Sequence, residues 1–300
     1  MTRSDSRRGM VLVTVLWSIS LLSALAMAAS VNFRGFAGVM AVERDRVQAE
    51  ALLTAGLETA AGIMQTSGAL MDGETTLTLG TGAVRARISY EGGRIDIGKA
   101  PVELLASMFG SVGAPQATAD IIAKRIVERR TSNNAAKPDD GTRSYNQAPQ
   151  PASTDQPFAD IRELRSIPNM DPKWIAATAP LATVYGDQSV NPLTAPLGVI
   201  AALPGVDPQR AAAFIKARRN SAPDADRLMG LLGPARQYLA VKPQLVASVD
   251  LTAELASGFI TTAHAVIVVL PQDSQPYRVL VWTPMAFAKA SIWNGPVAQR

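Results

Sequence analysis

Few residues in this chain have the types and spacing needed for catalysis. Its 300 residues include one histidine, His264, and no cysteine. Without cysteine the chain can form neither a disulfide framework nor a cysteine-based metal site, and one histidine cannot build a multi-histidine zinc site. The sequence also lacks a nucleophile motif and a phosphate-binding loop. These features predict that the protein is not an enzyme.

Carboxylates are the remaining candidates for metal binding. Asp139 and Asp140 precede Gly141 in a polar stretch, and Asp155 and Asp160 follow them. Because oxygen-rich loops can hold Ca²⁺, Asp139 and Asp140 are candidate ligands for a structural calcium ion. Their spacing does not follow a recognised calcium motif, so a solvated aspartate pair is the alternative interpretation. We expect no other cofactor.

The positive charge of the chain is concentrated at its N-terminus. The formal net charge is +4, and Arg3, Arg7 and Arg8, offset by Asp5, contribute +2 of it. The rest of the chain is nearly balanced. A broad nucleic-acid binding surface is therefore not expected.

A long apolar stretch follows these basic residues. Residues 10–29 carry no charged side chain, and as a helix they would span about 30 Å, the thickness of a bilayer core. The arginines before the stretch predict a cytoplasmic N-terminus. Three interpretations are open: a cleaved secretory signal ending near Ala26-Met27-Ala28, a plain signal anchor, or a leader (residues 1–9) cut between Gly9 and Met10.

The residues after Ala29 favour the third interpretation. No turn signal follows, and residues 30–65 continue with the apolar spacing of an amphipathic helix. Gly35, Gly38 and Gly56 weaken this helix but allow bending or close packing. The sequence thus predicts a membrane helix that continues as a long stem.

The N-terminal segment resembles that of a known family. Arg8-Gly9-Met10-Val11-Leu12-Val13-Thr14-Val15-Leu16-Trp17, followed by Leu21-Leu22, is similar to the start of type II secretion system protein K, the large minor pseudopilin. The resemblance implies that a prepilin peptidase cuts after Gly9 and that the new N-terminal residue, Met10, is methylated. Pseudopilins are also known for structural calcium sites.

Thr14 is the most informative residue of the resemblance. Most pilins and pseudopilins carry glutamate as the fifth mature residue, whereas here the fifth residue counted from Met10 is Thr14; K proteins are the usual exception. An unpaired charge in lipid costs several kcal/mol, and in pilins this glutamate pairs with the terminal amine of a neighbour. A subunit without it fits best at the end of a filament. The alternative is that Thr14 is only a tolerated residue of an unrelated anchor.

Two segments have the pattern of strands. Residues 75–79 and 83–90 alternate polar and apolar residues around a glycine turn, which predicts a hairpin, and residues 94–97 predict a third short strand. Strand patterns return after Pro243, where residues 277–282 are expected to pair with residues 265–270. We therefore expect a β domain formed by residues 66–98 and 242–300.

Residues 99–241 have helical patterns, interrupted by a polar loop at residues 131–155. They contain a repeat, in which Ala100-Pro101 and Ala195-Pro196 each precede a helix, a glycine turn and a second helix ending in arginine. Such pairs resemble helix-hairpin-helix modules, which bind DNA phosphates, so a membrane-anchored extracytoplasmic DNA-binding protein is the alternative function. Asp207 in the second turn and the near balance of charges argue against it.

The expected fold class is α+β. A long N-terminal helix would pack on an antiparallel, pilin-like sheet, with an inserted all-α domain that contains two helix-hairpin-helix-like repeats. The resemblance implies a minor pseudopilin at the tip of the pseudopilus, which helps to initiate its assembly and supports protein export. It implies that minor pseudopilins I and J are partners, that the chain spans the bacterial inner membrane once, and that its main domain is periplasmic without a nucleic-acid partner.

Overall fold

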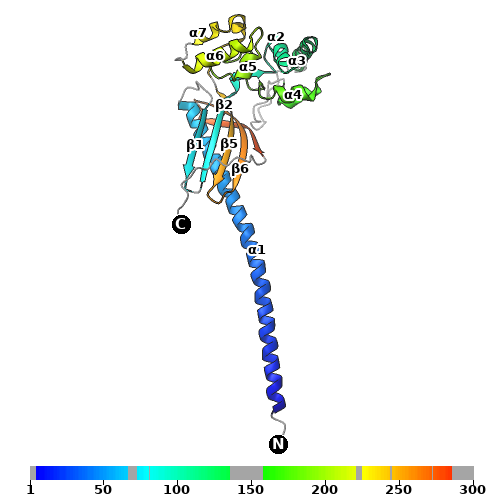
Figure 1. The fold of residues 1–300 in the computed structure, drawn as a ribbon, viewed down its shortest axis with the longest axis vertical. Coiled ribbons are helices and arrows are strands. Elements are labelled where there is room, and N and C mark those ends of the chain that lie inside the picture. Colours follow the sequence, from blue (N-terminus) through cyan, green and yellow to red (C-terminus); the bar gives the residue numbers. More distant parts are fainter. Residues whose placement is uncertain are drawn as a thin grey trace, which may run out of the picture.

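The computed structural model describes residues 5–66, 73–80, 82–135, 158–220, 225–243, 245–271 and 273–285. A long helix runs from the N-terminus to a sheet that packs on its far end, and a group of short helices lies beyond the sheet (Figure 1). The chain is therefore a mixed helix and sheet protein with an apolar N-terminal helix.

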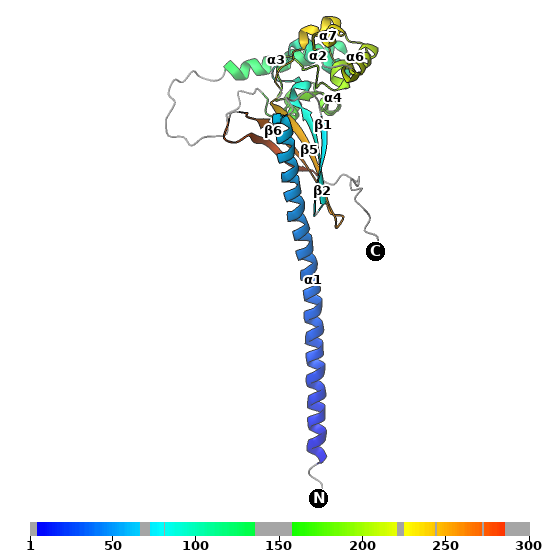
Figure 2. The same cartoon turned by 90° about the vertical axis from the view of Figure 1, so that its left-hand side faces the viewer.

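Helix α1 (Asp5–Thr66) is 62 residues long. Two views at right angles show its N-terminal part extending away from the rest of the chain (Figures 1 and 2). Its last turns pack on the sheet through buried residues spaced three or four apart, so that they share one helix face. These residues are Ala49, Leu52, Leu53, Leu57, Ala60, Ala61 and Met64.

The main sheet is antiparallel throughout, with the strand order β1-β2-β5-β6-β7. Its strands are β1 (Gly73–Leu79), β2 (Gly82–Tyr90), β5 (Val246–Leu255), β6 (Ile260–Val269) and β7 (Tyr277–Met285). The predicted hairpin is confirmed by the pairing of β1 with β2. The pairing of the Tyr277 segment with the apolar run before Pro271 is confirmed by β6 and β7.

The sheet and α1 approach each other closely at Gly56. A Cβ atom at this position would lie 2.7 Å from Cγ2 of Val84 on β2, which is shorter than a van der Waals contact. The absence of a side chain therefore lets the helix lie against the strand. At the other end of the sheet, the hydroxyl of Tyr277 donates a hydrogen bond to Glu58 of α1 over 2.8 Å. Burial and this bond to a carboxylate raise the pKa of Tyr277 to about 12.

The helical part lies in the chain between β2 and β5, which are neighbours in the sheet. Its longer elements are α2 (Val102–Ser111), α3 (Gln116–Ala135), α4 (Pro172–Thr178), α5 (Leu197–Ala201), α6 (Pro208–Asn220) and α7 (Ala225–Gly230). Three short 3-10 helices accompany them: η1 (Glu91–Gly93), η2 (Ile161–Ser166) and η3 (Gly233–Tyr238).

The third strand lies elsewhere than the sequence pattern suggested. β3 (Ile95–Asp96) pairs in parallel with β4 (Ala182–Thr183) in a separate two-stranded sheet. Ile95 and Ile97 are fully buried in the hydrophobic core of the helical part and not in the core between α1 and the main sheet. A two-residue strand forms too few backbone hydrogen bonds to determine which strand it pairs with. Burial of Ile95 and Ile97 therefore determines the pairing.

Candidate functional site

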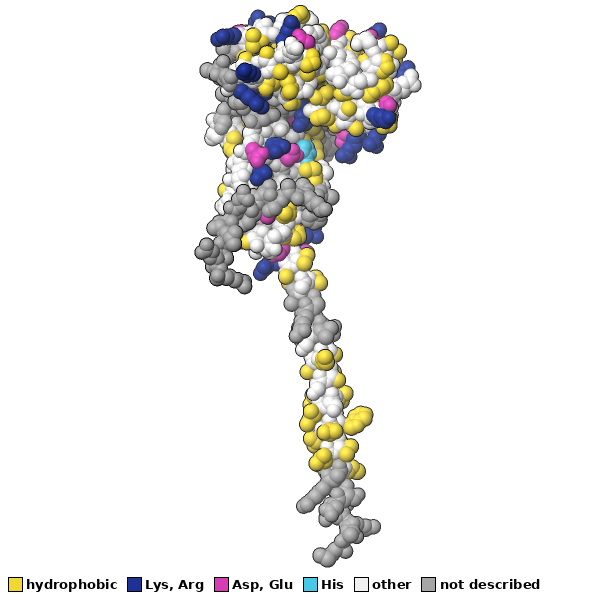
Figure 3. Space-filling model, viewed as in Figure 1, with side chains coloured by type: hydrophobic (Ala, Val, Ile, Leu, Met, Phe, Trp, Pro, Cys, Tyr) yellow, Lys and Arg dark blue, Asp and Glu magenta, His cyan; other side chains and the backbone are white. Residues whose placement is uncertain are grey.

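The apolar N-terminal part of α1 is the first candidate site. Residues Met10–Ala28 have a mean hydropathy of 2.2 and none of this window is buried within the chain. Figure 3 shows this part of the stalk with hydrophobic side chains and no lysine, arginine, aspartate or glutamate where it is described. Met10, Leu12, Leu16 and Trp17 are at least 63% exposed. So much exposed apolar surface on a single helix suits a lipid environment.

Thr14 satisfies its own polar group within the helix. Its hydroxyl donates a hydrogen bond of 2.5 Å to the carbonyl oxygen of Met10, and the hydroxyl of Ser18 donates one of 2.8 Å to the carbonyl of Thr14. Such back-bonds let hydroxyl residues lie in an apolar helix. Gly9, Met10 and Thr14 all lie in the N-terminal part of α1. Cleavage after Gly9 and methylation of Met10 stay predictions.

The internal repeat appears in the structure as two turns with the same hydrogen bonds. The carboxylate of Asp96 accepts a hydrogen bond from the N–H of Gly98 (2.7 Å), and the side-chain oxygen of Asn191 accepts one from the N–H of Leu193 (2.9 Å). The carbonyls of the same two residues accept the N–H groups four residues later, at 2.9 and 3.0 Å. In both copies, therefore, the same turn precedes a proline and the helix that follows it.

A second helix follows each of these turns. A glycine with positive φ separates the helices in both cases, Gly113 (92°) between α2 and α3 and Gly205 (73°) between α5 and α6. This left-handed conformation strongly favours glycine. The two pairs differ in length, because α2 has 10 residues and α5 has only 5.

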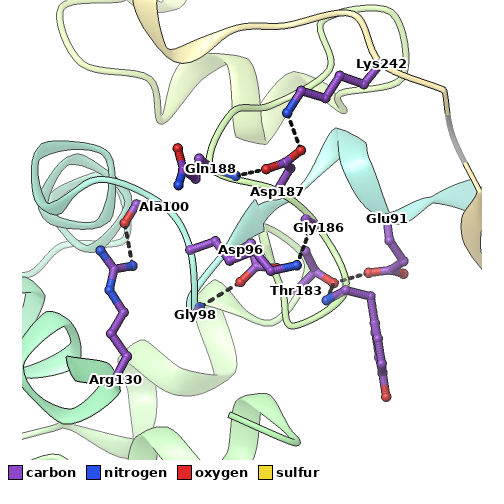
Figure 4. A network of polar contacts seen from close by, with 12 residues as sticks. Glu91, Asp96, Gly98, Ala100, Arg130, Thr183, Gly186, Asp187, Gln188 and Lys242 are labelled. Atoms are coloured by element: carbon purple, nitrogen blue, oxygen red, sulfur yellow. Dashed lines mark hydrogen bonds and ion pairs between the residues drawn. The ribbon is translucent and has the colours of Figure 1, made fainter. Parts of the chain in front are cut away.

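An arginine of each second helix holds the turn that precedes its pair. The guanidinium of Arg130 on α3 donates to the carbonyl of Ala100 at 2.8 Å, and that of Arg218 on α6 donates to the carbonyls of Pro192 and Ala195 at 2.8 and 2.6 Å. Figure 4 shows the first of these contacts. The sequence repeat predicted helices that end at Arg130 and Arg219, but α3 continues to Ala135 and α6 to Asn220, and the second contact is made by Arg218. In both pairs an arginine inside the second helix therefore positions backbone.

The side chain of Asp207 contacts the first turn of α6, the helix that follows it. Its carboxylate accepts a hydrogen bond from the N–H of Arg210 at 2.8 Å and lies 3.8 Å from the Arg210 guanidinium. The backbone hydrogen bond is the main reason that the pKa of Asp207 is lowered. A charged carboxylate therefore caps the start of α6, where a helix-hairpin-helix module would receive a phosphate.

Glu91 joins the sheet to the helical part. Its buried carboxylate accepts hydrogen bonds from the hydroxyls of Ser248 on β5 and Thr183 on β4, and lies 3.2 Å from the guanidinium of Arg94. Figure 4 shows the contact with Thr183. A buried carboxylate is stable only when paired and hydrogen-bonded. This network therefore determines how the two parts of the chain meet.

Three further contacts strengthen the junction. Lys242, just before β5, pairs with Asp187, and the side-chain amide of Asn191 donates to the carbonyl of Lys242 at 3.3 Å. The hydrogen bond from Lys242 lowers the pKa of Asp187. Gly93 also packs against the backbone of Thr194, since a Cβ on Gly93 would lie 2.7 Å from its carbonyl carbon.

Asp96 is the acidic residue of the small sheet, and it is buried. Its side chain is 1% exposed, and the ammonium of Lys99 lies 3.8 Å away while donating to the carbonyl of Gly186 at 2.8 Å. Burial raises the pKa of Asp96, partly offset by Lys99 and by backbone hydrogen bonds.

Of the carboxylates considered for calcium, only Asp160 is among the described residues. Asp139, Asp140 and Asp155 are outside the described residues, and Asp160 caps η2 by accepting from the N–H of Arg162 at 2.6 Å. Within the described ranges, no cluster of three or more potential ligands could hold a metal ion.

Sequence reasoning missed Glu91 and the contact that it makes with Ser248. Glu91 stands next to two glycines, a pattern that predicts only a turn. Ser248 is a polar residue in an alternating strand, where a solvent-facing position is the default. Nothing local to either residue signals that they meet 157 positions apart.

Comparisons with known proteins agree with this architecture. A family model described as type II secretion system (T2SS), protein K, matches residues 90–187. A chain of the crystal structure of the GspK-GspI-GspJ complex from the enterotoxigenic Escherichia coli type 2 secretion system matches with a TM-score of 0.56 and 17% identity. The match covers 83% of this chain and 99% of that chain, and it shows a shared fold. No curated protein sequence matches.

Proposed function

We propose that this chain, which carries the type II secretion system protein K region at residues 90–187, is a minor pseudopilin at the tip of the pseudopilus. It helps to initiate pseudopilus assembly and protein export across the outer membrane. The family match and the shared fold support the secretion role. The observation that carries the tip position is Thr14, whose hydroxyl donates to the Met10 carbonyl in the apolar part of α1, none of which is buried within the chain.

The physical argument concerns the terminal amine that cleavage after Gly9 would create at Met10. In a bundle of membrane helices this charge needs a carboxylate. Thr14 provides none for a neighbour, and its hydroxyl is already used by the Met10 carbonyl. The terminal amine of this subunit can pair with the carboxylate of a neighbour, but the subunit has no carboxylate at Thr14 to pair with the amine of another neighbour. Such a subunit suits an end of the filament.

The helical part supports the same position. It extends the chain beyond the main sheet, at the end opposite the N-terminus of α1 (Figures 1 and 2). We interpret it as a domain inserted into a pilin-like unit, with its two turn-and-helix pairs as helix-hairpin-helix-like repeats. A wide insert of this kind would collide with its neighbours if it were stacked along a thin filament.

The remaining assignments follow from this role. Residues 1–9 are the leader removed by prepilin peptidase, residues 10–29 span the inner membrane once with the N-terminus cytoplasmic, and the rest is periplasmic. Pseudopilins I and J are the proposed partners, because the matched structure is described as a GspK-GspI-GspJ complex.

The role is structural and not enzymatic. The DNA-binding alternative loses its main feature, because Asp207 caps the start of α6.

The direct test is to coexpress the full chain with its prepilin peptidase and to sequence the mature N-terminus. We expect N-methylated Met10, and any other start contradicts the proposal. A Gly9→Leu variant, which should block cleavage, is the matched control. Copurification with pseudopilins I and J tests the partners separately.

A further inference from the structure

A groove runs between the face of the main sheet that is turned away from α1 and the segment containing η2 and α4. Its volume is about 460 Å³, comparable with sites that hold a ligand of several hundred daltons. The sheet contributes residues of β5, β6 and β7, including His264. Figure 3 shows both basic and acidic side chains around this histidine, with lysine and arginine side chains on the underside of the helical part; one acidic neighbour is Asp250, 2.7 Å from Nδ1 of His264.

The groove has an apolar floor. Val266 of β6 and Val281 of β7 line the groove on the sheet side, and Ile175 and Ala176 of α4 line it on the other side together with Ala179, the residue after α4. Ala176 and Ala179 are exposed small residues, so they leave room above the floor. This surface suits apolar side chains of a ligand that lies along the groove.

The groove lining contains three arginines, Arg94, Arg162 and Arg165, and two carboxylates, Glu91 and Asp160, so positive charge exceeds negative charge by one. Arg165 of η2 is exposed, and no described residue pairs with it. Arg162 is 77% exposed and lies 3.9 Å from Asp160, near the limit of an ion pair. Glu91 adds little opposing charge, since the guanidinium of Arg94 compensates its charge and two hydroxyls donate hydrogen bonds to it.

From this charge and shape we infer that the groove binds an extended acidic segment of another polypeptide. Its carboxylates pair with Arg162 and Arg165, and its alternate apolar side chains lie against Val266, Val281 and Ala176. The groove is lined by a sheet on one side and by a helix on the other, so a chain in extended conformation can place its alternate side chains against both. Charged rims of this kind set specificity and association rate. The inference does not depend on the tip position proposed above.

The experiment uses the full chain in detergent and an end-blocked, fluorescein-labelled peptide in which valine alternates with aspartate and glutamate. Fluorescence anisotropy measures its binding at low salt. We expect it to bind at least tenfold more tightly than the same peptide with lysine at the acidic positions. Arg165→Glu and Arg162→Glu should each weaken binding about tenfold. Arg219→Glu, the same change on α6, should alter it less than twofold.

A steric pair of variants tests the location. Ala176→Trp fills the groove and should abolish binding, whereas Ala177→Trp, on the same helix but outside the groove lining, should not. Equal binding of acidic and lysine peptides, or equal effects of Arg165→Glu and Arg219→Glu, would overturn the inference. So would binding of anionic vesicles or DNA in preference to the acidic peptide. None of these outcomes bears on the cleavage site at Met10.

Discussion

The hydroxyl of Ser248 on β5 donates a hydrogen bond to the buried carboxylate of Glu91 on η1. The same carboxylate is bound by Thr183 and Arg94, so one side chain ties together the main sheet, the small sheet and the turn that connects them. The groove that we propose to bind an acidic segment lies beside this junction, because Glu91, Thr183 and Ser248 are among its lining residues. Its geometry therefore depends on the Glu91 network.

Replacing Glu91 with alanine should destabilise the chain substantially. Arg94, Thr183 and Ser248 would each lose a buried acceptor, and breaking such a network typically costs about 2–4 kcal/mol. Urea unfolding of the full chain in detergent, followed by near-ultraviolet circular dichroism, measures the loss. Glu74→Ala is the control, because Glu74 is 42% exposed and pairs with Arg85 on the sheet surface; we expect a change within about 1 kcal/mol. Equal losses for the two variants would contradict the role of Glu91.

Asp96 predicts a particular pH dependence of stability. Because burial raises the pKa of Asp96 in the folded chain above its ordinary 3.8, the folded chain binds this proton more tightly than the unfolded chain. The contribution of Asp96 to the free energy of unfolding therefore falls as pH rises from 3.8 through the folded pKa. Asp96→Asn removes this fall and keeps an acceptor for Gly98, as Asn191 does in the second repeat. Relative to the parent, the variant should gain stability as pH rises from 3 to 7.

Asp187 provides the control of opposite sign. Its pKa is lowered by the hydrogen bond from Lys242, so its contribution is present above pH 3.8 and is lost as pH falls through the folded pKa. Asp187→Asn should therefore lose stability relative to the parent at neutral pH and match it in acid. Chemical unfolding curves at several pH values measure both variants. Parallel pH profiles for the two would contradict the assignments.

Two glycines of α1 should respond in opposite ways to the same substitution. Gly62→Ala should stabilise the chain by roughly 0.5–1 kcal/mol, because alanine favours helix and no atom lies within 4 Å of the new Cβ. Gly56→Ala should destabilise it by about 1–3 kcal/mol, since its Cβ would meet Val84 at 2.7 Å and overpack the contact between helix and sheet. Thermal unfolding of the two variants provides the comparison. A gain in melting temperature for both would show that α1 does not pack as described.

Thr14→Glu tests the tip position. The new carboxylate lies near the membrane surface and should permit insertion of α1, but it supplies the acidic group that the native residue lacks. We expect the variant to enter the body of the pseudopilus and to change the number and length of filaments seen by electron microscopy. Thr14→Ser, which keeps the hydroxyl, should behave like the parent. Unchanged filaments with Thr14→Glu would count against the tip argument.

Local patterns in the sequence were enough to predict several elements. Apolar spacing along α1 predicted the face that carries Leu53 and Leu57, and alternation in residues 83–90 predicted β2. The repeated Ala-Pro steps predicted two helices joined by a glycine turn in each copy, as found in α2 and α3 with Gly113 and in α5 and α6 with Gly205. All these signals come from neighbours within a few residues, where helix and strand periodicity acts directly.

Long-range burial decided the rest. The pattern at residues 94–97 predicted a strand of the β domain. Ile95 instead pairs with Ala182, because the side chain of Ile95 is buried in the core of the helical part. The carboxylate of Glu91 and the groove beside Arg165 exist only because segments far apart in the chain meet. The sequence alone determined which local elements form and that Met10–Ala28 could cross a membrane. Only the tertiary structure determined which charges are buried and which stay free to bind, because desolvation depends on every segment that packs around a group.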